Sequence, residues 1–79
     1  MPRFYFHVDG GSRDDGGCEI EDLAKAKCEA VDMAGRLICE DSDTFWERKD
    51  WGMSVTDEEG LTLFSLTFFA TESAALEAV

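Results

Sequence analysis

The longest periodic pattern of apolar and polar residues in the chain runs from Asp22 to Asp41. At 100° per residue, the apolar side chains fall on one broad arc and the charged ones on the opposite arc, which predicts an amphipathic helix. Asp22 is placed to act as its N-cap, because a carboxylate there can accept hydrogen bonds from the first backbone amides. So wide an apolar face needs a sheet to cover it. The apolar arc comprises Leu23, Ala24, Ala26, Ala30, Val31, Met33, Ala34, Leu37 and Ile38.

Three other segments have the composition of β-strands. Residues 3–8 and 51–57 alternate between two faces, as a strand with one buried face does. Residues 61–69 are apolar on both faces, which predicts that this strand is the central one. The face expected to contact the helix carries Phe4, Phe6, Phe64, Leu66 and Phe68.

The connections between these segments are polar or rich in glycine. Residues 9–17 contain four glycines and three aspartates, which predicts a loop. Residues 42–50 form a charged connector with room for one extra helical turn, and residues 57–60 form a hairpin turn. Thr71 can cap a last weak helix that ends at Val79.

The order strand, helix, strand, strand predicts a single α+β domain over residues 1–79. An antiparallel hairpin with the last strand central gives a three-stranded sheet of order 2-3-1. The one long helix then lies across one face, and the crossover from the first to the second strand is right-handed. A short C-terminal helix completes this β-α-β-β arrangement.

The opening segment, Met-Pro-Arg-Phe-Tyr-Phe-His-Val, resembles the start of a family of small bacterial proteins built on a domain of unknown function. This family is abundant in rhizobia and related alphaproteobacteria, and its members begin Met-Pro-Arg-Tyr-Phe-Phe-His. The connector at residues 42–50 departs from the family pattern. The resemblance implies the fold and a cytoplasmic location, but no activity. Further matching positions are Gly17, Ile20, Asp22, Ala26, Glu29, Ala30, Val55, Asp57, Glu58 and Gly60.

The chain carries 18 acidic and 7 basic residues, for a net charge of −11. This charge argues against direct binding of nucleic acid, which needs a basic surface, and against binding an anionic membrane. It favours a basic partner or cations. No apolar run approaches the roughly 20 residues of a membrane span, and no secretory leader follows Met1. Cys28 and Cys39 lie too far apart on one helix for a disulfide, so three reduced cysteines indicate the cytoplasm.

Candidate chemistry is sparse. His7 is the only histidine, and the spacings between Cys18, Cys28 and Cys39 do not fit a zinc site. The loop at residues 9–17 matches neither a phosphate-binding motif nor the EF-hand pattern. We therefore expect no enzymatic activity, no cofactor and no metal site. Weak divalent-cation binding by the acidic loop stays open as an alternative.

Two surfaces are candidates for recognition. The predicted topology brings the first loop, the helix start and the hairpin turn to one end of the molecule, which would form an acidic pole. The sheet face opposite the helix would stay apolar and open, which is typical of an interface. The acidic pole comprises Asp9, Asp14, Asp15, Glu19, Glu21, Asp22, Asp57, Glu58 and Glu59. The open face comprises Tyr5, His7, Leu61, Leu63 and Phe69.

These surfaces support two functional hypotheses. The first is a small acidic interaction module without enzymatic activity, forming a homodimer through the open face. The second is an acidic mimic of nucleic acid that binds a basic protein. Either a second copy or the C-terminal segment could cover the open face.

Overall fold

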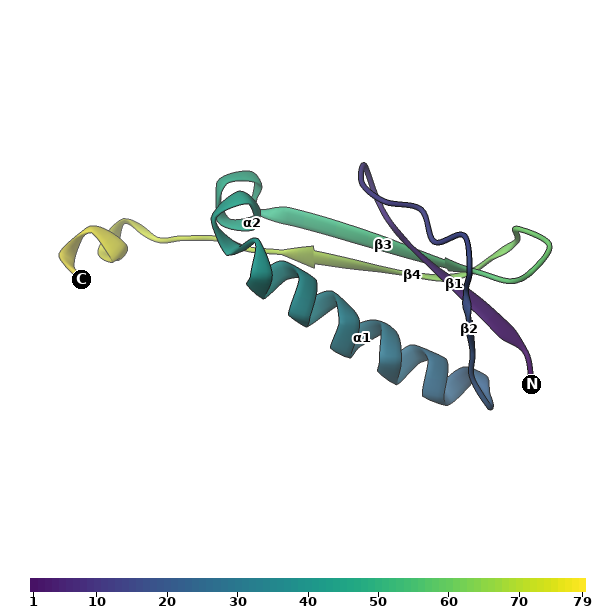
Figure 1. The fold of residues 1–79 in the computed structure, drawn as a ribbon. Helices are drawn as coiled ribbons and strands as arrows, with labels where there is room; N and C mark the ends of the chain where they lie inside the picture. The colour runs from purple at the N-terminus through teal and green to yellow at the C-terminus, as the bar shows by residue number, and fades with distance from the viewer.

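The computed structural model describes all residues from Met1 to Val79. It is a mixed α/β fold with an antiparallel sheet of four strands in the order β2-β1-β3-β4 (Figure 1). The strands are β1 (Arg3–Val8), β2 (Cys18–Glu19), β3 (Asp50–Thr56) and β4 (Thr62–Phe69).

The chain has two α-helices: α1 (Leu23–Glu40) runs along one face of the sheet, and α2 (Ser42–Arg48) stands at the end of the sheet where β3 begins (Figure 1). The carboxylate of Asp22 caps α1 as predicted, accepting a hydrogen bond from the Lys25 amide at 2.9 Å. The connector predicted to hold one extra turn instead forms α2, a second helix of seven residues. Lys49 ends α2 in the left-handed conformation (φ 64°) and leads the chain into β3.

The predicted three-stranded sheet of order 2-3-1 is wrong. Cys18 pairs with Phe4 and Glu19 with Arg3, which adds a fourth strand and carries the chain back to the start of β1 before α1 begins. α1 then starts beside the beginning of β1 and ends beside the end of β1 (Figure 1). The chain therefore returns in β3 antiparallel to β1, and not parallel to it as the predicted topology required. The expected right-handed crossover between parallel strands is therefore absent, and β4 lies at an edge rather than at the centre.

The core forms where α1 crosses the sheet. Ala26, Ala30 and Ala34 are fully buried and are spaced by four residues, so one narrow stripe of small side chains faces the strands. Phe4, Phe6, Met53 and Val55 meet this stripe from β1 and β3. The side chains that β4 turns toward the helix are only partly buried against this core: Phe64, Leu66 and Phe68.

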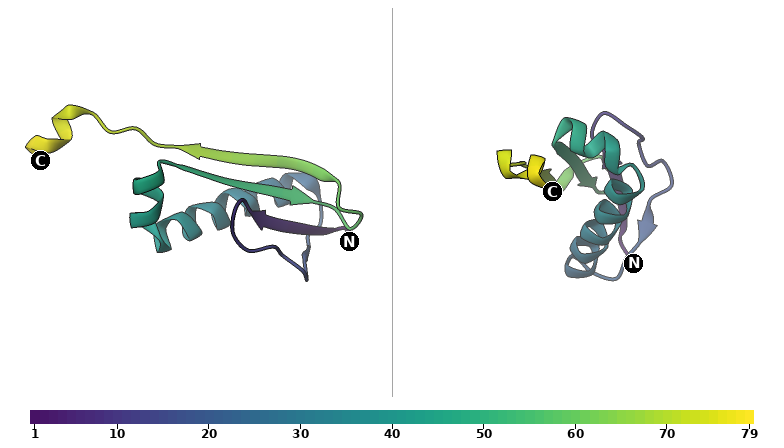
Figure 2. Two further views of the ribbon diagram at one scale, coloured as in Figure 1. Left: turned by 90° about the horizontal axis from the view of Figure 1, so that it is seen from above. Right: turned by 90° about the vertical axis from the view of Figure 1, so that its left-hand side faces the viewer.

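The molecule is elongated, with extents of 51 × 22 × 18 Å. Its radius of gyration is 14.7 Å, whereas a compact domain of this length would have about 12 Å. Figure 2 shows why: the C-terminal segment follows the line of β4 away from the body and ends in a short 3₁₀ helix, η1 (Ala74–Ala78). The weak terminal helix is thus present in 3₁₀ form, and it lies away from the sheet.

Candidate interaction surface

The loop at residues 9–17 is held along the outer edge of β1 by Asp14. One carboxylate oxygen accepts hydrogen bonds from the amides of Gly16 (3.2 Å) and Gly17 (3.0 Å), and the other from Phe6 (3.2 Å). The Asp14 amide itself donates to Nδ1 of His7 at 3.1 Å. The glycine-rich loop is therefore fixed on β1 by one side chain.

Two opposing influences act on the pKa of Asp14. Partial burial raises it, but the three backbone amides of Gly17, Phe6 and Gly16, together with the nearby His7, lower it more. The net result is a pKa below the usual 3.8, so the loop is held by an ionised carboxylate at neutral pH.

His7 is buried by this loop, with 9% of its surface exposed. Its Nδ1 accepts from Asp14, so in the neutral ring the proton lies on Nε2, which donates to Oγ1 of Thr56 at 3.0 Å. The prediction that His7 belongs to an open face is therefore wrong, because the loop folds back over it. Both ring nitrogens therefore take part in hydrogen bonds within the protein.

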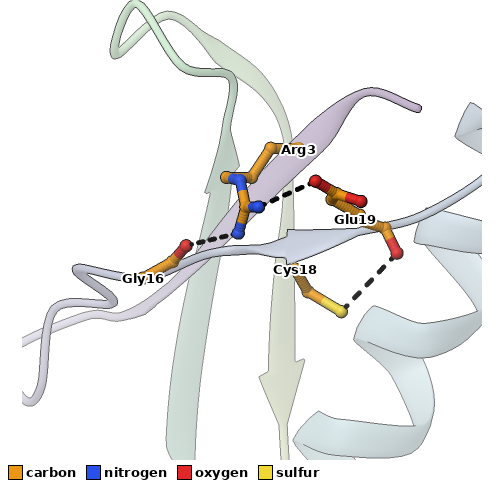
Figure 3. A network of polar contacts seen from close by, with 4 residues as sticks. All are labelled: Arg3, Gly16, Cys18 and Glu19. Carbon is orange, nitrogen blue, oxygen red and sulfur yellow. Dashed lines mark hydrogen bonds and ion pairs between the residues drawn. The ribbon is translucent and has the colours of Figure 1, made fainter.

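Arg3 fastens the far side of the same loop (Figure 3). Its guanidinium donates to the carbonyl oxygen of Gly16 at 2.8 Å and to the carboxylate of Glu19 at 2.9 Å. Gly17, with φ +70°, passes so close to β1 that a Cβ there would lie 2.8 Å from atoms of Arg3 and of Tyr5. This contact half-buries Tyr5, so the loop also covers the second residue that β1 was expected to contribute to the open face.

The other three residues predicted for the open face lie on β4 or directly before it, and all three are exposed. Leu61, Leu63 and Phe69 are 62%, 44% and 78% exposed. Leu63 stands at a β-bulge, because Thr56 of β3 pairs with Thr62 and the preceding Val55 with Phe64. We call Leu61, Leu63 and Phe69 the β4 surface. Leu61 and Leu63 lie near the hairpin turn, whereas Phe69 lies at the opposite end of β4, with Ser65 and Thr67 between them. The structure separates all three from Tyr5 and His7.

The C-terminal segment does not cover the β4 surface. It extends beyond the sheet (Figures 1 and 2), and its apolar side chains Leu76 and Val79 are themselves 49% and 103% exposed. An ion pair of 3.1 Å between Lys49 and Glu72 fastens only its beginning. Of the two coverings considered for the open face, the terminal segment is therefore not the one adopted in this structure.

The expected single acidic pole is divided. Because β1 and β3 are antiparallel, the turn that carries Asp57, Glu58 and Glu59 lies beside the start of β1, whereas Asp9 follows its other end and hydrogen-bonds to Gly52. Asp14 and the neighbouring Asp15 lie between the two ends, in the anchored loop. Glu19 lies opposite Arg3 at the start of β1, and so at the same end of the molecule as the hairpin turn. Glu21 and Asp22 follow Glu19 in the chain and lead to the start of α1.

A groove that the sequence did not indicate lies at the other end, with a volume of about 560 Å³. It is bounded by the first loop, the C-terminal end of α1, α2 and the start of β3. Phe45 and Trp51 supply apolar walls, and Arg48 is the one basic residue in its lining. The aromatic residues of the 42–50 connector were the only signal of it in the sequence. The acidic residues that line it are Asp9, Glu40, Asp41 and Asp50.

The structure contains no cluster of three or more histidine, cysteine or acidic side chains arranged to hold a metal ion. All three cysteines, Cys18, Cys28 and Cys39, are free and exposed. Neither helix has the length and apolar character needed to cross a lipid bilayer.

Comparison with known families shows one match: a family model described as a domain of unknown function, DUF6894, covers residues 3–70. The match spans the sheet and both helices and ends where the extended C-terminal segment begins. No curated protein and no solved structure matches the chain.

Proposed function

The chain belongs to the DUF6894 family of domains of unknown function, and we propose that it is a small acidic interaction module, without enzymatic activity, that forms a homodimer. The observation that carries this proposal is the exposure of Leu63 and Phe69 on β4 and of Leu61 directly before it. Large apolar side chains left in water along an uncovered strand are typical of protein interfaces.

The energetics favour association at this surface. Burying one exposed leucine or phenylalanine stabilises a complex by about 1.5–3 kcal/mol, so three such side chains on each copy provide a substantial driving force. Only 10 of the 79 residues are buried within one chain, which leaves the isolated domain with a small core.

The non-enzymatic part of the proposal is supported by the surroundings of the reactive side chains. Both ring nitrogens of His7 are engaged, and the cysteines lie apart from it on β2 and α1. The proposal assigns the chain no catalytic residue, no cofactor, and no direct contact with nucleic acid or membrane.

A basic protein is the alternative partner, with the chain acting as an acidic mimic of nucleic acid. The groove beside α2 favours this alternative, because Asp9, Asp41 and Asp50 line it against a single arginine. Basic nucleic-acid-binding proteins recovered with the chain from native cells, in a salt-sensitive complex, would support it over self-association.

We infer the cellular setting from the sequence. The opening at residues 1–8 is the basis for a bacterial origin among the alphaproteobacteria, and three exposed free thiols favour the reducing cytoplasm.

The proposal is tested by the solution mass of a Leu63→Lys variant, measured by sedimentation equilibrium. We expect the unmodified chain to be a dimer and the variant a monomer with unchanged circular dichroism, because a lysine would bury its charge in the interface. Leu23→Lys is the matched control, since Leu23 has nearly the same exposure (46%) but lies on α1. An unmodified chain that stays monomeric at high concentration would contradict the proposal.

A further inference from the structure

The outer edge of β4 has no neighbouring strand, and its backbone groups can be assigned from the register. The Asp9 amide donates to the carbonyl of Gly52, so the backbone N–H and C=O of Gly52 face β1. Thr67 lies opposite Gly52 on β4. Its backbone N–H and C=O therefore point away from β3, toward the free edge. By the same alternation, the backbone N–H and C=O of Ser65 and Phe69 also point to the free edge. The amide of Ala70 points the other way and donates to the carbonyl of Lys49.

This edge lacks the usual features that prevent strand pairing. β4 is eight residues long and contains neither a charged residue nor a proline. The bulge at Leu63 interrupts only its beginning, so the stretch from Phe64 onward is regular. Side chains on both of its faces are at least partly exposed. A strand added here would satisfy the free backbone groups and cover those side chains.

We propose that the occupant of this edge is the β4 edge of a second copy of the chain, paired antiparallel so that the two sheets become one. This inference rests on the homodimer proposed above and specifies how the copies join. An antiparallel pair of identical strands is related by a two-fold axis, so each copy offers the other the same complementary edge.

The charge distribution favours a second copy over another partner. A chain of net charge −11 repels its own kind, but the stretch from Gly60 to Thr71 is the longest in the sequence without a charged residue. Two copies can therefore meet here without bringing like charges into contact. A basic partner would find no acidic side chain on β4 itself to pair with.

The exposed surface area of the chain is larger than that of a compact monomer, by about the area that one partner buries in a dimer. The chain exposes 5622 Å², whereas a compact monomer of its 8.8 kDa mass would expose about 4800 Å². The excess of about 800 Å² is what each partner contributes to a standard protein interface. The projecting C-terminal segment and the uncovered β4 side chains both contribute to this excess (Figure 2).

Hydrogen exchange of the unmodified chain tests the pairing directly. At concentrations where the dimer forms, we expect the amides of Ser65, Thr67 and Phe69 to exchange slowly, and at high dilution rapidly. The amides of Leu66 and Phe68, which face β3, serve as internal controls and should stay slow at both concentrations. Rapid exchange of the three outward amides in a confirmed dimer would overturn the edge pairing.

A backbone variant gives the second measurement. Thr67→Pro removes one outward amide without breaking a bond to β3, and proline is tolerated at the solvent side of an edge strand. We expect it to abolish the dimer, while Thr67→Ala, which keeps the amide, remains dimeric. A folded Thr67→Pro variant that is still a dimer would overturn the edge pairing but leave the homodimer intact. If that variant does not fold, hydrogen exchange of the unmodified chain decides. A wild-type chain that is monomeric throughout would overturn both proposals.

Discussion

The carboxylate of Asp14 accepts hydrogen bonds from the amides of Phe6, Gly16 and Gly17, while its own amide reaches His7. These contacts decide which part of the sheet is covered and which is left open. A single loop residue therefore sets the boundary of the β4 surface, because it holds the loop over β1 and not over β4.

We expect Asp14→Ala to lower the free energy of unfolding by about 1–3 kcal/mol, because three backbone donors lose their charged acceptor. Thermal unfolding followed by circular dichroism measures this effect. Asp15→Ala is the control, since Asp15 is exposed and makes no side-chain hydrogen bond. Equal losses from the two substitutions would contradict the anchoring role.

The low pKa of Asp14 also predicts a pH dependence. The folded state holds this carboxyl ionised below the usual 3.8, so its contribution to stability is fully present above that pH. It is lost as the pH falls through 3.8 toward the folded value. Acid titration of the melting temperature should therefore be shallower in the same Asp14→Ala variant. Parallel profiles would contradict the assignment.

Among the elements, α1 depends on its stripe of alanines. Ala30 is fully buried against the sheet, so Ala30→Asp would bury a carboxylate without a partner at several kcal/mol. A domain of this size has only about 5–10 kcal/mol of stability, and we expect the variant to lose its cooperative thermal transition. Ala24→Asp, on the exposed side of α1, should melt almost normally. A cooperative transition near the wild-type temperature in Ala30→Asp would show that this face is not buried.

Periodicity predicted α1 and the three long strands because each has a clear apolar pattern. At residues 18–20 it allowed only a short extended piece and did not place β2 in the sheet, since Cys18 and Glu19 are both exposed and two residues carry no alternation. That omission had consequences, because β2 reverses the chain before α1 and so sets the direction of β3. The wrong topology then placed β4 in the centre and gathered the acidic residues at one end. The burial of His7 depends on the loop contacts of Asp14, which no pattern in the sequence reveals.

The whole molecule carries its excess negative charge at both ends. One end holds the turn with Asp57, Glu58 and Glu59, and the other holds the groove with Asp9 and Asp50. Salt screens repulsion between exposed charges over about 8–10 Å.

We therefore expect the melting temperature to rise between low and moderate sodium chloride concentration. Calcium chloride at matched ionic strength is the comparison. Equal shifts from the two salts would remove the alternative that the acidic loop binds a divalent cation, and a larger shift with calcium would support it. A melting temperature independent of salt would contradict the repulsion.

The brevity of β2 bears on how the proposed assembly would end. Its two residues, one of them the charged Glu19 held by Arg3, close the second edge of the sheet to further strands. A sheet able to recruit neighbours on both sides would grow without limit into a fibre. If two copies pair through β4 as proposed, the dimer has no free β4 edge left, so assembly ends at two copies.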